Sequence, residues 1–398
     1  MRVLVLSQYP VEEARHGGQL RLRGLIEAYK SAGHDVALAG VLGGTGYPES
    51  VGFLPHPTGA LSKPKYGGIG NEDLGIARLL SEGGDYYTKL VKKIEVIPDV
   101  IHVEQPWLFA FAQMYAKSVH DQKVVKLVYG SQNVEFVLKR EILAAANHPE
   151  TEELTEAVRQ LELSAVREAD AVICVSQSDV DWVKQHSDVP VHLASNGISP
   201  SSADTAGIEA ANQLTQKHKF GLFCGSAHQP NVNGFASMFG GGFGSLDHDQ
   251  RLVIAGAAGY LINAHPVLQT SSKLTDNLII AGMVSDQCLA GLLATAHCIV
   301  LPITQGGGTN LKTAEALWAG KHIVATKVAM RGFEAFIGTP GVTVEDSPGG
   351  FKRALRRAMQ APALILSDAD RQARKVVLWE ACLQNLPAFV ENIVGRAS

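Results

Sequence analysis

Cysteine is scarce in this chain of 398 residues: five are present, they are scattered, and no two of them form a CxxC pair. This pattern excludes a disulfide framework and indicates reduced thiols that lie mostly in the core. No HExxH sequence or similar spacing of metal ligands occurs, so we expect no bound metal.

Long hydrophobic runs are also missing. The apolar run in the opening MRVLVLSQYP spans only about five residues, and no later stretch reaches the roughly 18 that a membrane span requires. We therefore expect a cytoplasmic protein. An excess of charge of one sign is lacking too, because the formal net charge is -4. This balance gives no overall attraction to nucleic acid, and we expect no nucleic-acid partner.

The chain is, by contrast, rich in hydrophobic residues, and these recur in short runs along the sequence. Hydrophobic residues make up 46% of it and charged residues 19%, so it can fill large cores, and its length favours two domains. Short runs rich in Val, Ile and Leu alternate with segments of helical spacing, which predicts an α/β protein with parallel strands and crossover helices. We expect strands at 2–7, 35–40, 100–104, 124–130, 171–176 and 192–195, and then at 220–225, 252–256, 278–282, 298–302, 322–326 and 341–345.

The two sets of strands are separated by SNGISPSSADTAG, a small and polar segment that is typical of a linker. We therefore predict a first Rossmann-like domain at 1–197 and a second at 198–380, facing each other across a cleft. A final helix at about 380–398 could pack back on the first domain. The segment 54–86 is the least regular part, and we interpret it as a mobile loop.

The segment PITQGGGTNLKTAEALWAGK, at 302–321, is the strongest candidate for a binding site. Bare backbone N–H groups at the start of a helix bind anions, and glycine lets a phosphate approach the main chain. Lys312 adds a positive charge, and Glu315 could accept hydrogen bonds from vicinal hydroxyls. The simpler alternative is a glycine-rich turn followed by a surface ion pair. The candidates for binding a diphosphate here are Gly306, Gly307, Gly308, Thr309, Asn310, Lys312 and Glu315.

Further candidates follow strands of the first half. Gly17 and Gly18 open a helix after the first strand and form a second possible anion site, although an ordinary strand-turn-helix with two glycines is the simpler alternative. His102 and Glu104 close a strand that should end at the cleft, where a carboxylate could orient a hydroxyl acceptor. A polar strand end bonded to a neighbouring loop is the alternative.

Asn133 and Glu135 begin a helix after the strand predicted at 124–130, so capping is their ordinary role. We nevertheless include both among the candidates for the acceptor side.

The ordered set of these segments resembles a retaining glycosyltransferase of the GT-B architecture, in the family that includes sucrose and mannosyl transferases. The segments are MRVLVLSQYP with HGGQ, DVIHVEQP, SQNVE, EADAVICVSQSD, ASNGIS, LFCGSAHQPNVNG and LPITQGGGTNLKTAEALWAGKHIVAT. The resemblance implies a nucleotide-sugar donor held mainly by the second domain, an acceptor held mainly by the first, and no cofactor or metal. It implies contact of Gly17 and Gly18 with the donor diphosphate and of Glu315 with the ribose.

Three departures from the family pattern affect the site. The first glutamate of the E-x7-E pattern falls at Gly307, and the histidine near the reacting carbon is replaced by Gln132. The basic pair after the first strand of the second domain is absent, which leaves Gly225, His228 and Asn231 there. Lys312 thus becomes the expected cation, because an unmatched diphosphate would lose electrostatic stabilisation.

The sequence therefore predicts transfer of a sugar from a nucleoside diphosphate to a hydroxyl acceptor, with retention. We expect Gln132, Lys312 and Glu104 to be the catalytic residues. A nucleotide-sugar epimerase of the same fold and a non-catalytic GT-B-like partner protein are the alternatives. The acceptor could be lipid-linked, which would bring peripheral association with a membrane.

Overall fold

The computed structural model describes residues 1–14, 16–63, 71–145, 147–200, 202–240, 242, 246–266, 277–305 and 310–395. These residues divide into two compact units. The first contains 1–196 and 382–395, and the second contains 197–305 and 310–381. The predicted boundary between 197 and 198 differs from this division by one residue.

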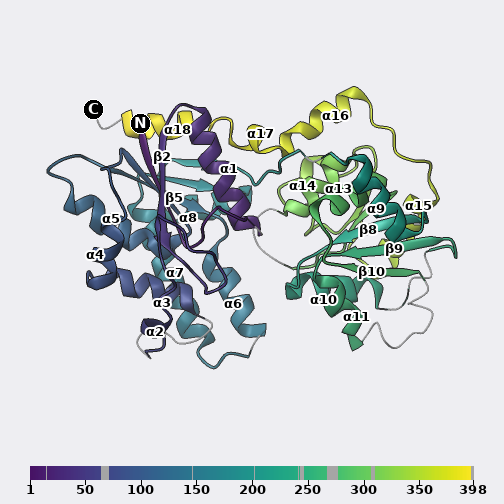
Figure 1. The fold of residues 1–398 in the computed structure, drawn as a ribbon, viewed down its shortest axis with the longest axis horizontal. Helices are drawn as coiled ribbons and strands as arrows, with labels where there is room; N and C mark the ends of the chain where they lie inside the picture. Colours follow the sequence, from purple (N-terminus) through teal and green to yellow (C-terminus); the bar gives the residue numbers. More distant parts are fainter. Residues whose placement is uncertain are drawn as a thin grey trace. The chain divides into compact units, whose positions relative to one another are not determined.

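Each unit is built on one parallel sheet, and both appear in Figure 1. The described part of the first unit forms a seven-stranded sheet in the order β3-β2-β1-β4-β5-β6-β7. The described part of the second forms a six-stranded sheet in the order β10-β9-β8-β11-β12-β13. The expectation of two parallel-sheet α/β domains is confirmed.

The strands of the first sheet are β1 (Arg2–Ser7), β2 (Asp35–Val41), β3 (Phe53–Leu54), β4 (Val100–Glu104), β5 (Lys126–Ser131), β6 (Ala171–Cys174) and β7 (Val191–Leu193). Its helices are α1 (Gly17–Ser31), α2 (Thr58–Leu61), α3 (Glu72–Ser81), α4 (Asp85–Val91), η2 (Pro106–Leu108), α5 (Phe109–Ser118), α6 (Glu135–Ala145), α7 (Thr151–Glu168), α8 (Gln177–His186) and α18 (Leu386–Gly395). In Figure 1, α18 lies beside α1, so the last helix of the chain packs on the first unit.

The strands of the second sheet are β8 (Lys219–Cys224), β9 (Gln250–Ala255), β10 (Leu278–Gly282), β11 (Cys298–Leu301), β12 (His322–Ala325) and β13 (Val342–Val344). Its helices are α9 (Thr205–Thr215), α10 (Gln229–Phe239), α11 (Ala258–Ala264), α13 (Asp286–Thr295), α14 (Leu311–Ala319), η4 (Glu334–Phe336), α15 (Pro348–Gln360), α16 (Asp368–Arg374) and η5 (Lys375–Val377), and α17 (Trp379–Leu383) crosses the boundary.

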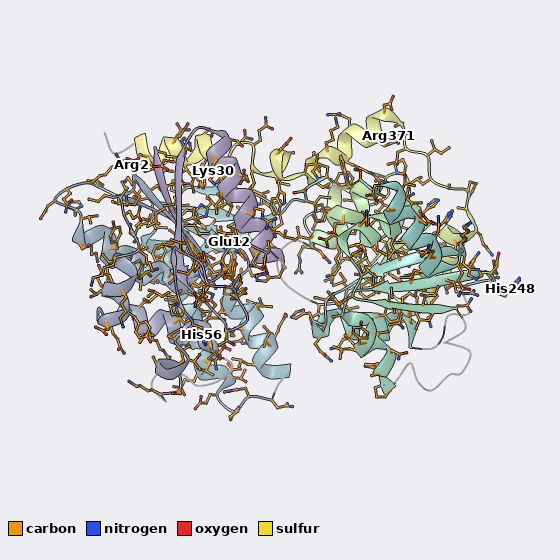
Figure 2. All side chains as sticks on the ribbon, viewed as in Figure 1. Arg2, Glu12, Lys30, His56, His248 and Arg371 are labelled. Carbon is orange, nitrogen blue, oxygen red and sulfur yellow. The ribbon has the colours of Figure 1, made fainter. Side chains whose placement is uncertain are left out.

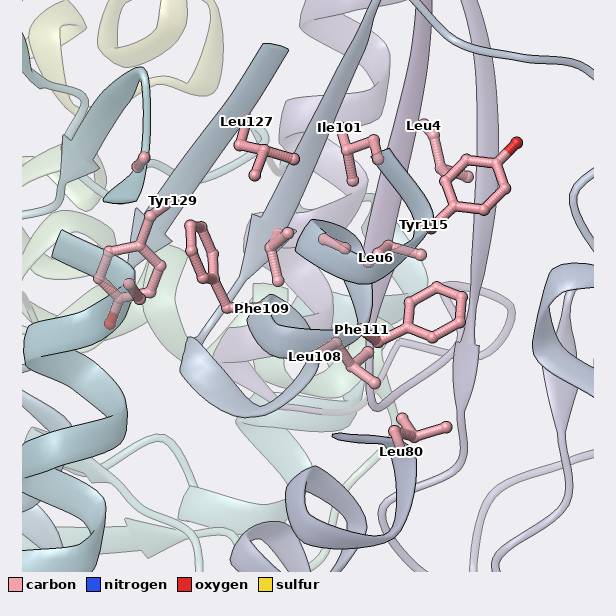
Figure 3. Packing of buried hydrophobic residues seen from close by; sticks show 14 of the residues in the cluster. Leu4, Leu6, Leu80, Ile101, Leu108, Phe109, Phe111, Tyr115, Leu127 and Tyr129 are labelled. Atoms are coloured by element: carbon pink, nitrogen blue, oxygen red, sulfur yellow. The ribbon is translucent and has the colours of Figure 1, made fainter. Parts of the chain in front are cut away.

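Central strands are buried on both faces, which is why they read as continuous apolar runs. The side chains of β1 from Val3 to Leu6 are at most 2% exposed. Figure 3 shows Leu4, Leu6 and Ile101 packed against aromatic rings of α5 in the main core of the first unit. Many charged side chains are exposed, among them Lys30 on α1 and Arg371 on α16, which are labelled in Figure 2.

The interpretation of 54–86 as an irregular, mobile loop is wrong for its described part. Phe53–Leu54 pairs with β2 as a seventh strand, and α2, α3 and the start of α4 lie within the segment. Leu74, Ile76 and Leu80 of α3 are buried in the core, so hydrophobic burial stabilises this helix despite the glycines that precede it. Residues 64–70 lie outside the described residues.

Candidate functional site

Helix α14 carries the strongest candidates in the second unit. It begins at a cap in which the Asn310 side-chain oxygen accepts a hydrogen bond from the Lys312 N–H at 3.2 Å. It ends at Gly320, whose φ of 68° is the left-handed conformation that stops a helix. Gly306, Gly307, Gly308 and Thr309 lie outside the described residues, so the structure gives no account of the glycine loop.

Lys312 and Glu315 lie one helical turn apart and are both half-buried. In the described part of the chain, neither side chain makes an ion pair or a hydrogen bond. Burial lowers the pKa of Lys312 and raises the pKa of Glu315, and each charge partly opposes the shift of the other. Two partly desolvated charges that attract each other but make no direct ion pair or hydrogen bond are costly to keep, which is typical of groups in a binding site.

The loop after β8 lies in the same electrostatic neighbourhood. Burial raises the pKa of Cys224, and the Glu315 carboxylate adds to the increase. Burial and then the Lys312 charge lower the pKa of His228, whose side chain is exposed at the start of α10. His228 is therefore an exposed polar group of this loop near the Lys312 charge.

Gly225 and Asn231 shape that loop. A Cβ at Gly225 would lie 3.0 Å from the Ala258 Cβ, so a larger residue would press on α11. Asn231 is 5% exposed, and its amide donates to the carbonyl of Ser226 at 3.0 Å and to the hydroxyl of Ser226 at 3.3 Å. Its side-chain nitrogen is thus bonded within the protein, and contact of Asn231 with a donor stays a prediction.

In the first unit, Glu104 lies at the centre of a buried polar network. Its Oε2 lies 3.3 Å from Nε of Arg21, and its Oε1 lies 3.0 Å from Nε2 of His102. The other ring nitrogen of His102 is 2.9 Å from the hydroxyl of Tyr29. Burial acts to raise the pKa of Glu104, but Arg21, His102 and the amide of Gln132 together hold it below its ordinary value. Glu104 is therefore ionised.

His102 and Glu104 were expected to meet an acceptor, and both are instead nearly inaccessible, at 0% and 1% exposure. Each atom that could contact a hydroxyl is engaged by another side chain. Glycine at 130 makes this packing possible, because a Cβ there would lie 2.2 Å from Oε1 of Glu104. The geometry favours the alternative for these two residues, a polar strand end bonded to its neighbours.

Gln132 is held by the same network. Its Nε2 donates to Oε2 of Glu104 at 2.6 Å, and its Oε1 accepts from the Tyr9 hydroxyl at 3.0 Å. The side chain is 8% exposed and both ends of its amide are used. The side chain is thus fixed in orientation, which leaves the main-chain carbonyl as the group of Gln132 that could act on a substrate.

Gly18, the second glycine of the pair at the start of α1, packs on this network. A Cβ on Gly18 would lie 2.5 Å from the Tyr9 hydroxyl and 3.2 Å from Oε1 of Gln132. Gly17 is exposed at the first position of the helix. The structure therefore connects Gly18 to residue 132 through Tyr9, and a close approach of chain segments explains why glycine is present.

Asn133 and Glu135 belong to a second polar group at the end of β5. Oε1 of Glu135 accepts from the Gln105 amide at 3.1 Å and from the Asn133 amide at 3.3 Å. Glu162 of α7 caps α6, since its carboxylate accepts from the N–H groups of Glu135 at 2.9 Å and Phe136 at 3.2 Å. Burial raises the pKa of Glu135 to about 7 and that of Glu162 to about 8.

The capping role expected of Asn133 and Glu135 is thus performed by Glu162, which the sequence analysis did not single out. The sequence analysis also missed Tyr9, Asp73 and Lys139. A buried acidic residue on the apolar face of α7 was the available signal for Glu162. Its partners lie 26 to 33 residues earlier in the chain, at a distance that no local pattern reveals.

Two searches for other kinds of site gave negative results within the described ranges. No group of three or more metal-ligating side chains occurs there. No described helix is both long enough and apolar enough to cross a membrane.

Comparison with known proteins gives matches on both halves of the chain. Residues 16–202 match the family "Glycosyltransferase Family 4", and residues 220–361 match the family "Glycosyl transferases group 1". No curated protein sequence matches.

Solved structures resemble the chain at low sequence identity. Sucrose-phosphate synthase from Thermosynechococcus elongatus matches with a TM-score of 0.71 and 16% identity over 100% of both chains. An Anabaena protein, HepE, in complex with UDP and glucose has a TM-score of 0.62 and 13% identity over 98% of this chain and 100% of that one. The catalytic domain of starch synthase IV from Arabidopsis thaliana, bound to ADP and acarbose, has a TM-score of 0.61 and 11% identity over 99% and 98%. These likenesses show the GT-B fold.

Proposed function

Because the chain belongs to the glycosyltransferases of family 4 and group 1, we propose that it transfers a sugar from a nucleoside-diphosphate sugar to a hydroxyl acceptor. The observation that carries the donor assignment is the pair of charges on α14. Lys312 and Glu315 are half-buried and make no direct ion pair or hydrogen bond with a described residue, so a ligand with complementary groups would stabilise both. The HepE structure, solved with UDP and glucose, supports the same class of donor.

The assigned roles follow from charge. The Lys312 ammonium group neutralises a diphosphate, together with backbone N–H groups at the start of α14. The Glu315 carboxylate accepts hydrogen bonds from ribose hydroxyls. His228, exposed at the start of α10 and electrostatically coupled to Lys312, is a further donor-side contact. In this scheme the leaving diphosphate is stabilised without a metal, so a chelator such as EDTA should leave activity unchanged.

We propose that transfer proceeds with retention, through attack on the face from which the nucleotide departs. In that mechanism, a phosphate oxygen of the leaving group takes the proton of the acceptor hydroxyl. The buried network around Glu104 supports this proposal, because a carboxylate that already contacts Arg21, His102 and Gln132 is a poor nucleophile. The anomeric configuration of the product, determined by NMR immediately after transfer, tests this part. Inversion would contradict it.

The donor assignment can be tested by thermal shift with UDP, GDP, ADP, TDP and CMP. Binding of one nucleotide should stabilise the protein by about 3 kcal/mol at 100 times its dissociation constant. Lys312→Ala and Glu315→Ala should each remove most of this shift while the ligand-free protein stays folded. Lys327→Ala is a matched control, because Lys327 is a 79% exposed lysine of the same unit, paired with Asp346 at 3.8 Å.

Equal shifts in the wild type and in both α14 variants would contradict the donor site. Activity then distinguishes the alternatives. Conversion of a nucleotide sugar to an isomer without any acceptor would indicate an epimerase. Binding of a nucleotide without turnover over a broad set of acceptors would indicate a non-catalytic protein, which the absence of a carboxylate at Gly307 would explain.

A further inference from the structure

Helix α15 of the second unit has a strongly basic outer face. It reads PGGFKRALRRAMQ, which contains four basic residues and no acidic one. The chain as a whole has a formal net charge of -4, so this positive face is a local feature. Phe351, Leu355 and Met359 are buried, and helical spacing places the basic residues together on the opposite side. These are Lys352, Arg353, Arg356 and Arg357, and the three arginines are exposed.

Most of this positive charge is not neutralised within the described part of the chain. Nη2 of Arg357 lies 4.0 Å from Oε1 of Glu345, which is a weak and partly exposed pair. Arg353 and Arg356 make no ion pair or hydrogen bond with a described residue. Two exposed guanidinium groups on one helix are therefore available to an anionic partner.

The segment that follows α15 is apolar. Residues 361–366 read APALIL, and Ile365 is 86% exposed. In Figure 1 this coil runs from α15 along the edge of the second unit towards α16. Gln360, the last residue of α15, is exposed one helical turn after Arg356. The basic face of the helix is thus continuous with an exposed apolar segment.

The exposure of Ile365 is fixed by the residues on either side of it. Leu366 is 6% exposed. Leu364 is half-buried, and a Cβ on Gly341 would clash with its Cδ2, so this leucine packs closely on the loop before β13. Because both neighbouring leucines are packed on the unit, the isoleucine between them is presented to the surroundings.

We propose that this surface, formed by Arg353, Arg356 and Ile365, docks on a membrane that contains anionic lipids. Guanidinium groups bind lipid phosphates, and an aliphatic side chain beside them enters the boundary between the head groups and the acyl chains. A nucleic acid would match the arginines equally well, but it offers no hydrocarbon layer to Ile365. The isoleucine is therefore the observation that favours a membrane. The proposal concerns the second unit alone and does not depend on the donor assignment.

The test is co-sedimentation of the full chain with vesicles of phosphatidylcholine alone and of phosphatidylcholine mixed with phosphatidylglycerol. Each cation near an anionic surface strengthens binding about fivefold, so the wild type should bind the mixed vesicles at least about tenfold more tightly than the neutral ones. Arg353→Glu combined with Arg356→Glu should weaken this binding at least about 25-fold. Ile365→Ser should weaken it about tenfold, because the apolar burial is lost.

Matched control variants are available in the first unit. Lys30→Glu combined with Lys184→Glu changes the net charge by the same amount at two exposed lysines. Val51→Ser removes an aliphatic side chain that is 91% exposed. Both controls should bind the mixed vesicles as the wild type does. Thermal unfolding of every variant separates misfolding from loss of membrane binding, and duplex DNA is added as a competitor.

The proposal is overturned if the wild type does not bind the mixed vesicles, or if the control variants weaken binding as much as the variants of α15 and Ile365. It is also overturned if Ile365→Ser has no effect while DNA displaces the vesicles, which would indicate a site for a polyanion. The proposed function is tested separately. A nucleotide-induced thermal shift that depends on Lys312 should be unchanged in the Arg353→Glu, Arg356→Glu variant.

Discussion

The two units treat their polar side chains in opposite ways. In the first unit, Arg21, His102 and Gln132 all contact the Glu104 carboxylate, and the four side chains are nearly inaccessible. On α14 of the second unit, Lys312 and Glu315 are half-buried and make no direct ion pair or hydrogen bond with a described residue. A buried network fixes the orientation of its side chains, whereas two partly exposed charges without a direct hydrogen bond can bind a ligand. Residue type alone does not distinguish the two situations.

The largest loss of stability is expected from removing the Arg21 side chain from the network around Glu104. Arg21→Ala would leave the Glu104 carboxylate buried without its cation, and loss of one partner of a buried pair costs about 3–5 kcal/mol. Lys126→Ala breaks a partly exposed pair with Asp170 and should cost about 1 kcal/mol or less. Urea unfolding of both variants measures the difference. Similar losses of unfolding free energy in the two variants would show that the Arg21–Glu104 pair contributes no more than a partly exposed ion pair.

The next largest effect concerns Glu135, whose pKa is raised from 4.5 to about 7, first by burial. A raised carboxyl pKa means that the folded state holds its proton more tightly, so the stability present below pH 4.5 is lost as the pH rises through 7. At about 1.4 kcal/mol per pKa unit, this loss is about 3 kcal/mol. Glu135→Gln keeps the acceptor oxygen for Gln105 and Asn133 and should remove the loss.

The measurement is the free energy of unfolding in urea at pH 4 and pH 8. The free energy of unfolding of the wild type should be clearly lower than that of Glu135→Gln at pH 8. At pH 4 this difference should be smaller. Parallel pH profiles for the two proteins would contradict the buried, protonated state of Glu135.

The smallest effect is the pH dependence of nucleotide binding in the second unit. Burial lowers the pKa of Lys312, so its positive charge is lost at a lower pH than that of an exposed lysine. Affinity for a nucleoside diphosphate should therefore fall a few-fold, up to about tenfold, as the pH rises from 7 to 10. Lys312→Arg keeps its charge over this range and should flatten the profile. Titration calorimetry of both proteins provides the test. Identical pH profiles would show that Lys312 does not bind the nucleotide.

Much of the fold could be predicted from local pattern. Runs such as RVLVLS and CIVLP are long enough and apolar enough to define buried parallel strands. Strand β3, which has two residues, carries no such signal, and α3 follows a glycine-rich stretch that suggests a loop. Their existence depends on packing against β2 and the core, which lie outside the local window.

For the candidate site as well, local features could be predicted from the sequence and long-range contacts could not. The sequence placed Lys312 and Glu315 one turn apart on a helix, and the structure agrees because helical spacing is a local property. It did not reveal that the side chain of Gln132 is fully bonded, or that Asn231 supports its own loop. These outcomes depend on Tyr9, 123 residues before Gln132, and on the turn at Ser226.

The sequence by itself determined the α/β class, the order of the strands along the chain and the residue types at the strand ends. These follow from hydrophobic periodicity and from glycine and cap residues, which act within a few positions of the chain. The tertiary structure decided which polar groups are bonded and which remain open. Pairing of Arg21 with Glu104 and of Asp73 with Lys139 requires the sheet to bring distant segments together, and only then is the cost of burying each charge determined.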